Sequence, residues 1–249
     1  MNKSDNQCEF YSLSAILVRP HSLPPLSLAG PMALIGQRNN PSAPLVPESI
    51  LAEFSTVAVS IISDVMNRLH GTKALRPYHR SGRLVGTAVT VKTRAGDNQT
   101  LHKAYDILRP GDVLVVDGGG DLIQALVGEI MMSRARAMGV AGFVIDGAIR
   151  DVDAFMTADF PCYARGVTHR GPYKTGPGEI NVPVSIDGMV VMPGDVIVGD
   201  TDGVVAFHPD EAAALLPLIR QQEAREANAL AAIAEGRVDS FYMGARTAP

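Results

Sequence analysis

The stretch from Asp112 to Asp151 restricts the fold of this chain more than any other part of its sequence. It holds an apolar run, Asp112–Asp117, then three glycines, then apolar residues at helical spacing over Asp121–Met138, and a second apolar run, Phe143-Val144-Ile145. The order strand, glycine loop, helix, strand is that of a βαβ unit, with parallel strands and a right-handed crossover. Ligands of such units collect at the carboxyl ends of the strands, so we expect functional residues there.

The flanking segments predict further helices and strands around this unit. An apolar face, with Pro47 before it, predicts a helix over Glu48–Leu69, and the Val- and Thr-rich alternation of Arg83–Arg94 predicts a strand. The remaining expectations are a short helix over Asn98–Leu108, only strands and turns over Val182–Phe207, and a long Ala-rich helix over Pro209–Glu235. The sequence therefore indicates an α/β protein.

A short motif occurs twice in the chain. Pro110-Gly111-Asp112 precedes the apolar Val113–Val116, and Pro193-Gly194-Asp195 precedes the apolar Val196–Val198, 83 residues further on. This distance argues against a solenoid of short repeats. It predicts two turns of similar structure, each leading into a buried strand.

Residues 1–46 differ from the rest of the chain, because they contain six prolines and little periodicity. We expect a poorly ordered extension or a docking arm here, or a translation start at Met32, followed by one domain over residues 47–240. The apolar segment Ile16–Ala29 is interrupted by prolines, Arg19 and His21, whereas a secretory signal has an unbroken apolar core.

Composition restricts the class of partner. Hydrophobic residues make up 46% of the chain, enough for a large core, and the formal net charge is -4. We therefore expect neither a nucleic-acid partner nor a membrane partner, since proteins bind both through clustered Lys and Arg. In addition, no apolar run approaches the length of about 18 residues that a membrane-spanning helix needs. The two cysteines, Cys8 and Cys162, are too few for a disulfide framework and favour a cytoplasmic location.

Arg150 and Asp151 follow the second apolar strand and are the first candidates for chemistry. An arginine held rigidly at a strand end can bind a carboxylate through two parallel hydrogen bonds. An adjacent aspartate can hold a hard divalent cation such as Mg²⁺, which commonly takes one or two carboxylates and keeps several waters. The same dipeptide is also typical of a surface ion pair at a turn.

The glycine loop and the predicted helix after it supply further candidates. Backbone N–H groups of Gly118, Gly119 and Gly120 would suit an anion such as a carboxylate, although the loop also fits a plain tight turn. It matches neither the dinucleotide nor the P-loop nucleotide pattern. Asp121 is expected to cap the helix, and Glu129, in its middle, faces either solvent or the site.

These elements together resemble a known signature. The segment GGGDLIQALVGEIMMSRARAMGVAGFVIDGAIRD resembles the RraA-like family, which includes the 4-hydroxy-4-methyl-2-oxoglutarate (HMG/CHA) aldolases. That family has an acidic residue, a spacer of twenty residues and then Arg-Asp, and here Glu129 stands in place of the more familiar Asp before Arg150-Asp151. The likeness extends over roughly Val57–Glu235. It implies a swivelling β/β/α fold with mixed sheets and flanking helices, and homotrimers or homohexamers with active sites between subunits.

The resemblance also implies a role for each residue. Arg150 would bind the carboxylate or keto group of a small 2-oxo acid, Asp151 would ligate Mg²⁺ or Mn²⁺, and Glu129 would orient water on the metal. Amides of the segment Gly118 to Leu122, with Asp121 in it, would bind the substrate carboxylate. The implied activity is cleavage of 4-hydroxy-4-methyl-2-oxoglutarate-type acids to pyruvate, with decarboxylation of oxaloacetate. Both reactions leave a pyruvate enolate, whose charge a metal and Arg150 would stabilise.

Two features bear on the mechanism. No lysine occurs between Lys103 and Lys174, which argues against an imine-forming aldolase unless Lys92, Lys103 or Lys174 folds into the site. The resembled family implies a glutamate base from a neighbouring subunit. Glu223 and Glu226 are candidates, but both also fit the solvated face of the last helix.

The rival hypothesis is a non-catalytic, protein-binding regulator of an RNA-degrading endonuclease, because the namesake of the family acts in that way. We favour the enzyme over this rival, because an enzyme needs the combination of Arg150, Asp151 and Glu129 and a pure regulator does not. The scattered histidines, among them His102, show no metal-binding spacing and are interpreted as structural.

Overall fold

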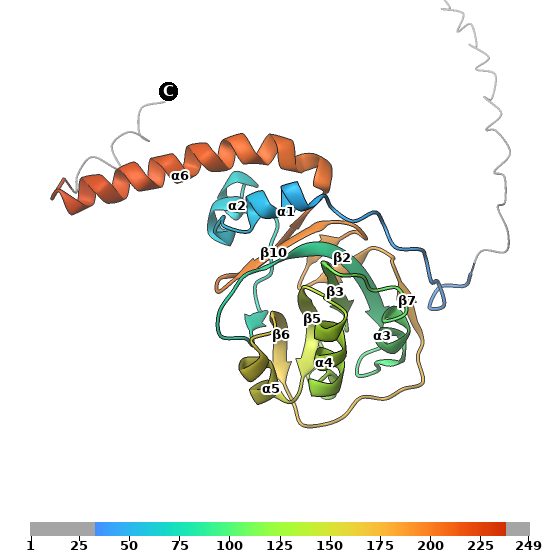
Figure 1. Cartoon of the computed structure of the whole chain (residues 1–249). Coiled ribbons are helices and arrows are strands. Elements are labelled where there is room, and N and C mark those ends of the chain that lie inside the picture. The colour runs from blue at the N-terminus through green and yellow to red at the C-terminus, as the bar shows by residue number, and fades with distance from the viewer. Residues whose placement is uncertain (1–32, 238–249) are drawn as a thin grey trace, which may run out of the picture. The chain divides into compact units, whose positions relative to one another are not determined.

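The computed structural model of the chain describes residues 33–237, whose centre is a nine-stranded mixed sheet (Figure 1). Its strands follow the order β1 (Arg76–Pro77), β6 (Cys162–Val167), β5 (Gly142–Ile149), β3 (Asp112–Asp117), β2 (Leu84–Thr93), β10 (Val196–Asp200) and β11 (Gly203–Phe207). The short strands β4 (Ala125–Val127) and β7 (Gly178–Ile180) pair with β5 and β2. The strands β8 (Val184–Ile186) and β9 (Met189–Val191) form a separate hairpin.

Four neighbouring strands, β2, β3, β5 and β6, run parallel to one another. Strands β3 and β5 are buried along their whole length, as expected for parallel strands that are covered on both faces. Side chains alternate between these faces. Leu114 and Val116 join one apolar cluster, and Val113 and Val115 join another.

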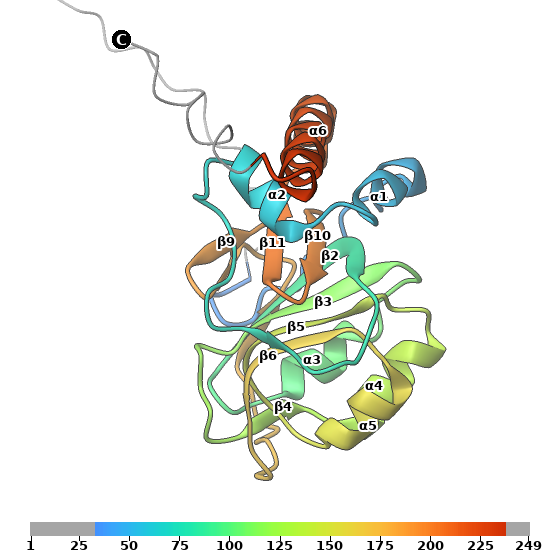
Figure 2. The same ribbon diagram turned by 90° about the vertical axis from the view of Figure 1, so that its left-hand side faces the viewer.

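Helices cover the sheet in two separate groups (Figure 2). The helices α3 (Gln99–Ala104), α4 (Glu129–Ala137) and α5 (Val152–Ala158) pack on the parallel strands through one cluster. The helices α1 (Glu48–Phe54), α2 (Val59–Val65) and α6 (Ala212–Ala234) pack on β10 and β11 through another, and the turn η1 (Pro209–Glu211) leads into α6. The expected layered α/β arrangement with a mixed sheet and flanking helices is confirmed.

One predicted helix is wrong in its extent. Glu48–Leu69 is divided into α1 and α2, because residues 55–58 leave the helical path. Val57 is fully buried in this break, and the backbone N–H of Val59 donates to the Asp200 carboxylate at 2.9 Å, which fixes the start of the second helix. The predicted strands β2 and β3, the helix-free region from β8 to β11 and the long last helix are confirmed.

The described part of the predicted N-terminal extension contacts the body of the protein. Arg38 donates to the Glu179 carboxylate through Nη2 at 2.9 Å, Asn40 N–H donates to the carbonyl of Ile180, and Val46 is buried. Residues 1–32, which include the alternative start at Met32, lie outside the described residues, and the domain boundary after residue 46 stays a prediction. No helix within residues 33–237 is long and apolar enough to cross a membrane.

Candidate active site

Arg150 and Asp151 lie at the junction between β5 and α5. The Arg150 N–H donates to the carbonyl of Val127 at 3.0 Å, which ties the end of β5 to β4. Asp151 takes a left-handed backbone conformation, with φ 58°, immediately before α5. The two side chains are each about two-fifths exposed, and Arg150 Nε lies 3.6 Å from Asp151 Oδ2. The predicted pair therefore stands at the carboxyl end of a rigid parallel strand.

The helix expected over Asp121–Met138 is wrong in its first part, because α4 begins only at Glu129. Residues 125–127 instead form β4, which pairs with β5 in parallel. Leu122 and Ile123, which fitted the helical pattern, are 49% and 56% exposed. Asp121 is no helix cap, since its Oδ2 accepts from the N–H groups of Ile123 and Gln124 within a turn.

The three glycine amides already have hydrogen-bond partners within the protein. Gly118 and Gly120 donate to the carbonyl of Asp146 at 3.1 and 3.0 Å, and Gly119 donates to Asp117 Oδ1 at 3.1 Å. Asp146 lies four residues before Arg150 on β5, and none of the three glycines lines the cavity beside Arg150. Asp121 nevertheless lies near the end of β5, because its carbonyl accepts from Ala148 N–H at 3.0 Å. The role of Gly118–Leu122 in substrate binding stays a prediction.

Gly128 takes the place beside Arg150 and Asp151 that we expected for the triple glycine. A Cβ atom at Gly128 would lie 2.5 Å from Asp151 Oδ2 and 3.0 Å from Arg150 Nε. The next amide, Glu129 N–H, donates to Asp151 Oδ2 at 3.0 Å, so Asp151 caps α4 from another element of the fold. A carboxylate is favoured at this position by the helix dipole. The glycine is what permits this close approach.

Glu129 therefore lies at the start of α4, not in its middle. Its backbone contacts Asp151, and its side chain is exposed. Among residues 33–237, no hydrogen bond or ion pair engages its carboxylate. The structure thus brings together the three residues of the predicted signature, but it joins Glu129 to Asp151 through the main chain.

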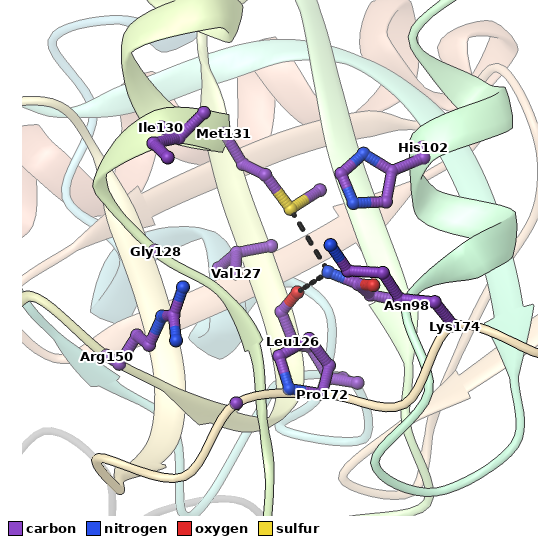
Figure 3. Close-up of a pocket in the computed structure, with 11 residues that line it drawn as sticks. Asn98, His102, Leu126, Val127, Gly128, Ile130, Met131, Arg150, Pro172 and Lys174 are labelled. Atoms are coloured by element: carbon purple, nitrogen blue, oxygen red, sulfur yellow. Dashed lines mark hydrogen bonds between the residues drawn. The ribbon is translucent and has the colours of Figure 1, made fainter.

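A cavity of about 290 Å³ opens next to Arg150 (Figure 3). Arg150 and Gly128 lie on one side of it, and His102 of α3 and Lys174 lie opposite, with Met131 and Ile130 of α4 above. None of the described residues that line the cavity is acidic. Its volume is at the lower end of the range for small-molecule sites, and its charges favour an anion.

Asn98 and His102 are placed on the cavity wall by one turn of α3. Asn98 Nδ2 donates to the carbonyl of Leu126 at 3.0 Å and contacts Met131 Sδ, while its buried Oδ1 has no partner among the described residues (Figure 3). Burial lowers the pKa of His102, and the nearby charges of Lys174 and Arg134 lower it further. His102 is therefore neutral at neutral pH and can accept a proton.

Asp97 holds together the two segments that form this cavity wall. Its fully buried carboxylate accepts from the N–H groups of Gln99, Thr175 and Gly176 at 2.8–3.0 Å, which joins α3 to the segment that carries Lys174. Burial alone would raise the pKa of Asp97, but these hydrogen bonds outweigh it and hold the pKa below its usual value.

Sequence reasoning missed Gly128, Asn98, His102 and Lys174 as site residues. The separation of Asn98 and His102 by four positions on a predicted helix places both on one face, which was an available signal. Lys174 is one of the lysines that we allowed as an exception to the argument against an imine-forming aldolase.

Glu223 and Glu226 do not line the cavity. Glu223 pairs with Arg220 at 2.9 Å, and Glu226 accepts from Gln222, all on α6.

The fold and the site together define a class: an α/β protein with an Arg-Asp pair at the end of a parallel strand, beside a helix start and a cationic cavity. The chain belongs to the RraA-like family (Aldolase/RraA), which matches residues 59–206. A protein of Halalkalibacterium halodurans named "Putative 4-hydroxy-4-methyl-2-oxoglutarate aldolase" is 39% identical over 175 residues, covering 70% of this chain and 83% of that protein. The family recognised from the sequence is thereby confirmed, and the name of this relative supports an aldolase.

Two solved structures share the fold. An uncharacterized protein from Pseudomonas syringae is 28% identical with a TM-score of 0.70, covering 78% of this chain and 96% of that chain. The RNA-processing inhibitor RraA from Thermus thermophilus is 30% identical with a TM-score of 0.56, covering 61% and 92%. The family thus contains proteins described as aldolases and a protein described as an inhibitor.

Proposed function

We propose that this protein is a divalent-metal-dependent lyase that cleaves 4-hydroxy-4-methyl-2-oxoglutarate-type acids to pyruvate and decarboxylates oxaloacetate. One observation carries the proposal: Arg150, the Asp151 carboxylate and the start of α4 converge around Gly128 beside an anion-favouring cavity. The aldolase name of a relative at 39% identity supports the same class of reaction.

The charge distribution of the cavity favours a substrate with two carboxylates. Arg150 stands on one side, and Lys174 stands on the other (Figure 3). In the proposed complex, Arg150 binds the carboxylate next to the keto group, and Lys174 attracts the distant one. A 2-oxo acid with a second carboxylate fits this arrangement better than pyruvate alone, which would leave Lys174 without an anionic partner.

Asp151 fits the needs of a hard divalent cation. Its Oδ2 is occupied by Glu129 N–H, but its Oδ1 has no hydrogen bond among the described residues, and its side chain is 42% exposed. Residues 33–237 contain no group of three or more His, Cys, Asp or Glu arranged to hold a metal. This donor set suits Mg²⁺ or Mn²⁺, which accept one carboxylate together with water and substrate oxygens. When bound, such an ion supplies a Lewis acid for the keto group.

The chain's own residues would act on the charge that develops during bond cleavage. Breaking the bond between C3 and C4, or releasing CO₂, moves an electron pair toward the keto oxygen. Arg150 would place a fixed positive charge near that oxygen. The position of this charge is held because the Arg150 backbone N–H is hydrogen bonded to β4. The amides of Ile130 and Met131 lie in the first turn of α4, where N–H groups have no helical partner and can bind a carboxylate.

Lys174 makes an imine mechanism testable. The absence of lysine from residues 104–173 argued against such a mechanism, but Lys174 does line the cavity. Treatment with pyruvate and sodium borohydride would fix an imine as a stable adduct on lysine. We expect no mass increase of the intact protein, and an adduct on Lys174 would refute the metal-based proposal.

We further propose that the protein assembles as a homotrimer or homohexamer. Three exposed apolar side chains lie where the segment after the glycine loop meets the end of β6: Leu122, Ile123 and Val167, each about half exposed. Tyr173, which is equally exposed, lies beside Gln124. Gly166 adjoins Leu122, and Thr168 is hydrogen bonded to the carbonyl of Ile123, which shows that the two segments are neighbours. Light scattering coupled to size exclusion should give three or six times the 26.4 kDa of one chain.

The decisive experiment measures pyruvate release from oxaloacetate and from 4-hydroxy-4-methyl-2-oxoglutarate by the full-length protein, with Mg²⁺ or Mn²⁺ and with EDTA. We expect release with either substrate, abolished by EDTA and restored by the metal. Activity that is indifferent to EDTA would contradict the role given to Asp151.

A second candidate function rests on the likeness to the inhibitor RraA from Thermus thermophilus. In that case the chain would be a non-catalytic, protein-binding regulator of an RNA-degrading endonuclease. This function would be favoured if neither acid releases pyruvate under any metal condition and the protein slows RNA cleavage by a purified endonuclease of that kind.

A further inference from the structure

The two Pro-Gly-Asp motifs form turns with the same hydrogen bonds, which confirms the predicted similarity. In the first turn, Asp112 N–H donates to the carbonyl of Arg109, and Arg109 N–H donates to Asp112 Oδ2 at 2.7 Å. In the second turn, Asp195 N–H donates to the carbonyl of Met192, and Met192 N–H donates to Asp195 Oδ2 at 2.8 Å. Each aspartate thus closes its own turn with one carboxylate oxygen.

The turns differ in what neutralises the aspartate. In the first, the Arg109 guanidinium donates to both Asp112 oxygens, from Nε and Nη2, at 3.1 Å each. In the second, methionine stands at the equivalent position, and Asp195 Oδ1 has no hydrogen-bond partner among the described residues. Asp195 is nevertheless only 5% exposed. A buried carboxylate oxygen without a hydrogen-bond partner is costly, and the second turn lacks the cationic donor that the first turn has.

Asp195 lines a second cavity, of about 510 Å³, on the other side of the molecule from the α4 helix. Its lining residues come from the end of α2, β9, β11, η1 and the start of α6, and Figure 2 shows α2, β9, β11 and α6 on the same side of the molecule. The wall is largely apolar, with Met66, Met192, Phe207 and Leu215 among its residues. Its charged lining consists of Asp195 and Glu211, with His70 and His208 beside them, and no described Lys or Arg faces it.

We propose that this cavity binds a small amphipathic organic cation, an alkylguanidinium whose head group pairs with Asp195 as the Arg109 guanidinium pairs with Asp112. The first turn supplies the geometric precedent within the same chain. The apolar wall suits the alkyl part of such a ligand, and the volume lies within the range of small-molecule sites. None of the residues that line this cavity lines the cavity of the proposed lyase site.

The ionisation of Asp195 agrees with a missing cationic partner. Burial raises the pKa of Asp195 above its usual value, although the Met192 N–H and the nearby His208 act in the opposite direction. A bound guanidinium beside Asp195 would offset the cost of burying the ionised carboxylate.

Calorimetric titration of the full-length protein with butylguanidinium tests the proposal, with the neutral N-butylurea as the matched ligand. We expect saturable binding of the cation and at least about tenfold weaker binding of the urea, since only the cation forms a charge-assisted pair. Equal binding of the two, or no saturable binding of butylguanidinium, would overturn the proposal, and this comparison needs no variant.

Two matched variants add a second measurement. Asp195→Asn should weaken butylguanidinium binding at least about tenfold while leaving the melting temperature unchanged or higher, because it removes an unpaired buried charge. Asp112→Asn should lower the melting temperature, because it leaves the Arg109 guanidinium without its carboxylate, and it should leave butylguanidinium binding intact. Undiminished binding by Asp195→Asn would also overturn the proposal.

Discussion

The substitution Gly128→Ala tests how closely the site depends on one missing side chain. The backbone of Gly128 is extended, with φ -154° and ψ -165°, so alanine meets no conformational obstacle there. Its Cβ would nevertheless lie 2.5 Å from Asp151 Oδ2, whereas ordinary contact begins at 3.4 Å. The Asp151 carboxylate, or the start of α4, must therefore move by about 0.9 Å.

A displacement of this size should affect activity far more than stability. Misplacing a reacting group by about 1 Å can cost about 100-fold in rate, so we expect kcat/KM for oxaloacetate to fall by about that factor. Stability should fall by only about 1 kcal/mol, for the hydrogen bond between Glu129 N–H and Asp151. This corresponds to a melting temperature lower by about 2–4 °C.

The matched control is Gly171→Ala, which borders the same arginine. Its Cβ would lie 3.2 Å from Arg150 Nη1, the end of a flexible side chain that can yield, and nothing else lies within 4 Å. Pyruvate release and thermal unfolding are measured for both variants. We expect Gly171→Ala to lose no more than about threefold in kcat/KM. If Gly128→Ala retained kcat/KM within the same factor, the assignment of Asp151 and Arg150 to the reacting centre would be refuted.

Three further predictions concern single side chains of the site. Asp151→Asn keeps an oxygen that can accept from Glu129 N–H, so it should melt like the wild type yet lose about 100-fold or more in metal-stimulated pyruvate release, while the neighbouring Asp153→Asn keeps full activity. Arg150→Lys should lower kcat/KM by about 10- to 100-fold in the same assay, because an ammonium cannot bind a carboxylate through two parallel bonds; full activity would exclude Arg150 from substrate binding. The pKa of Asp97 is lower in the folded protein than in the unfolded chain, where it is about 3.8. Its carboxylate therefore stabilises the fold at pH values above 3.8, and this contribution is lost as the pH falls through the pKa of the folded state. Urea unfolding should therefore show Asp97→Asn less stable by about 2 kcal/mol at pH 7, with the difference shrinking as the pH falls below 3.8; a difference that stays constant there would contradict the assigned ionisation.

The amino-acid sequence by itself determined the parts of this protein that depend on local pattern. An uninterrupted apolar run marks a buried strand, so the position of Arg150 and Asp151 at the end of β5 followed from the residues before them. The Pro-Gly-Asp turns were equally predictable, because each closes through bonds between residues three positions apart. The signature from Glu129 to Asp151 sufficed to recognise the family.

Only the tertiary structure decided where α4 begins and what faces Arg150. Apolar spacing around Leu122 and Leu126 fits a helix, yet pairing with β5 makes residues 125–127 a strand, because a neighbouring parallel strand offers hydrogen bonds that no local pattern records. The opposite wall of the cavity comes from α3 and from Lys174, which Asp97 joins through contacts 78 and 79 positions apart in the sequence. Such long-range contacts depend on how the strands are ordered in the sheet, and it is this order that placed Gly128, not the triple glycine, beside the Arg-Asp pair.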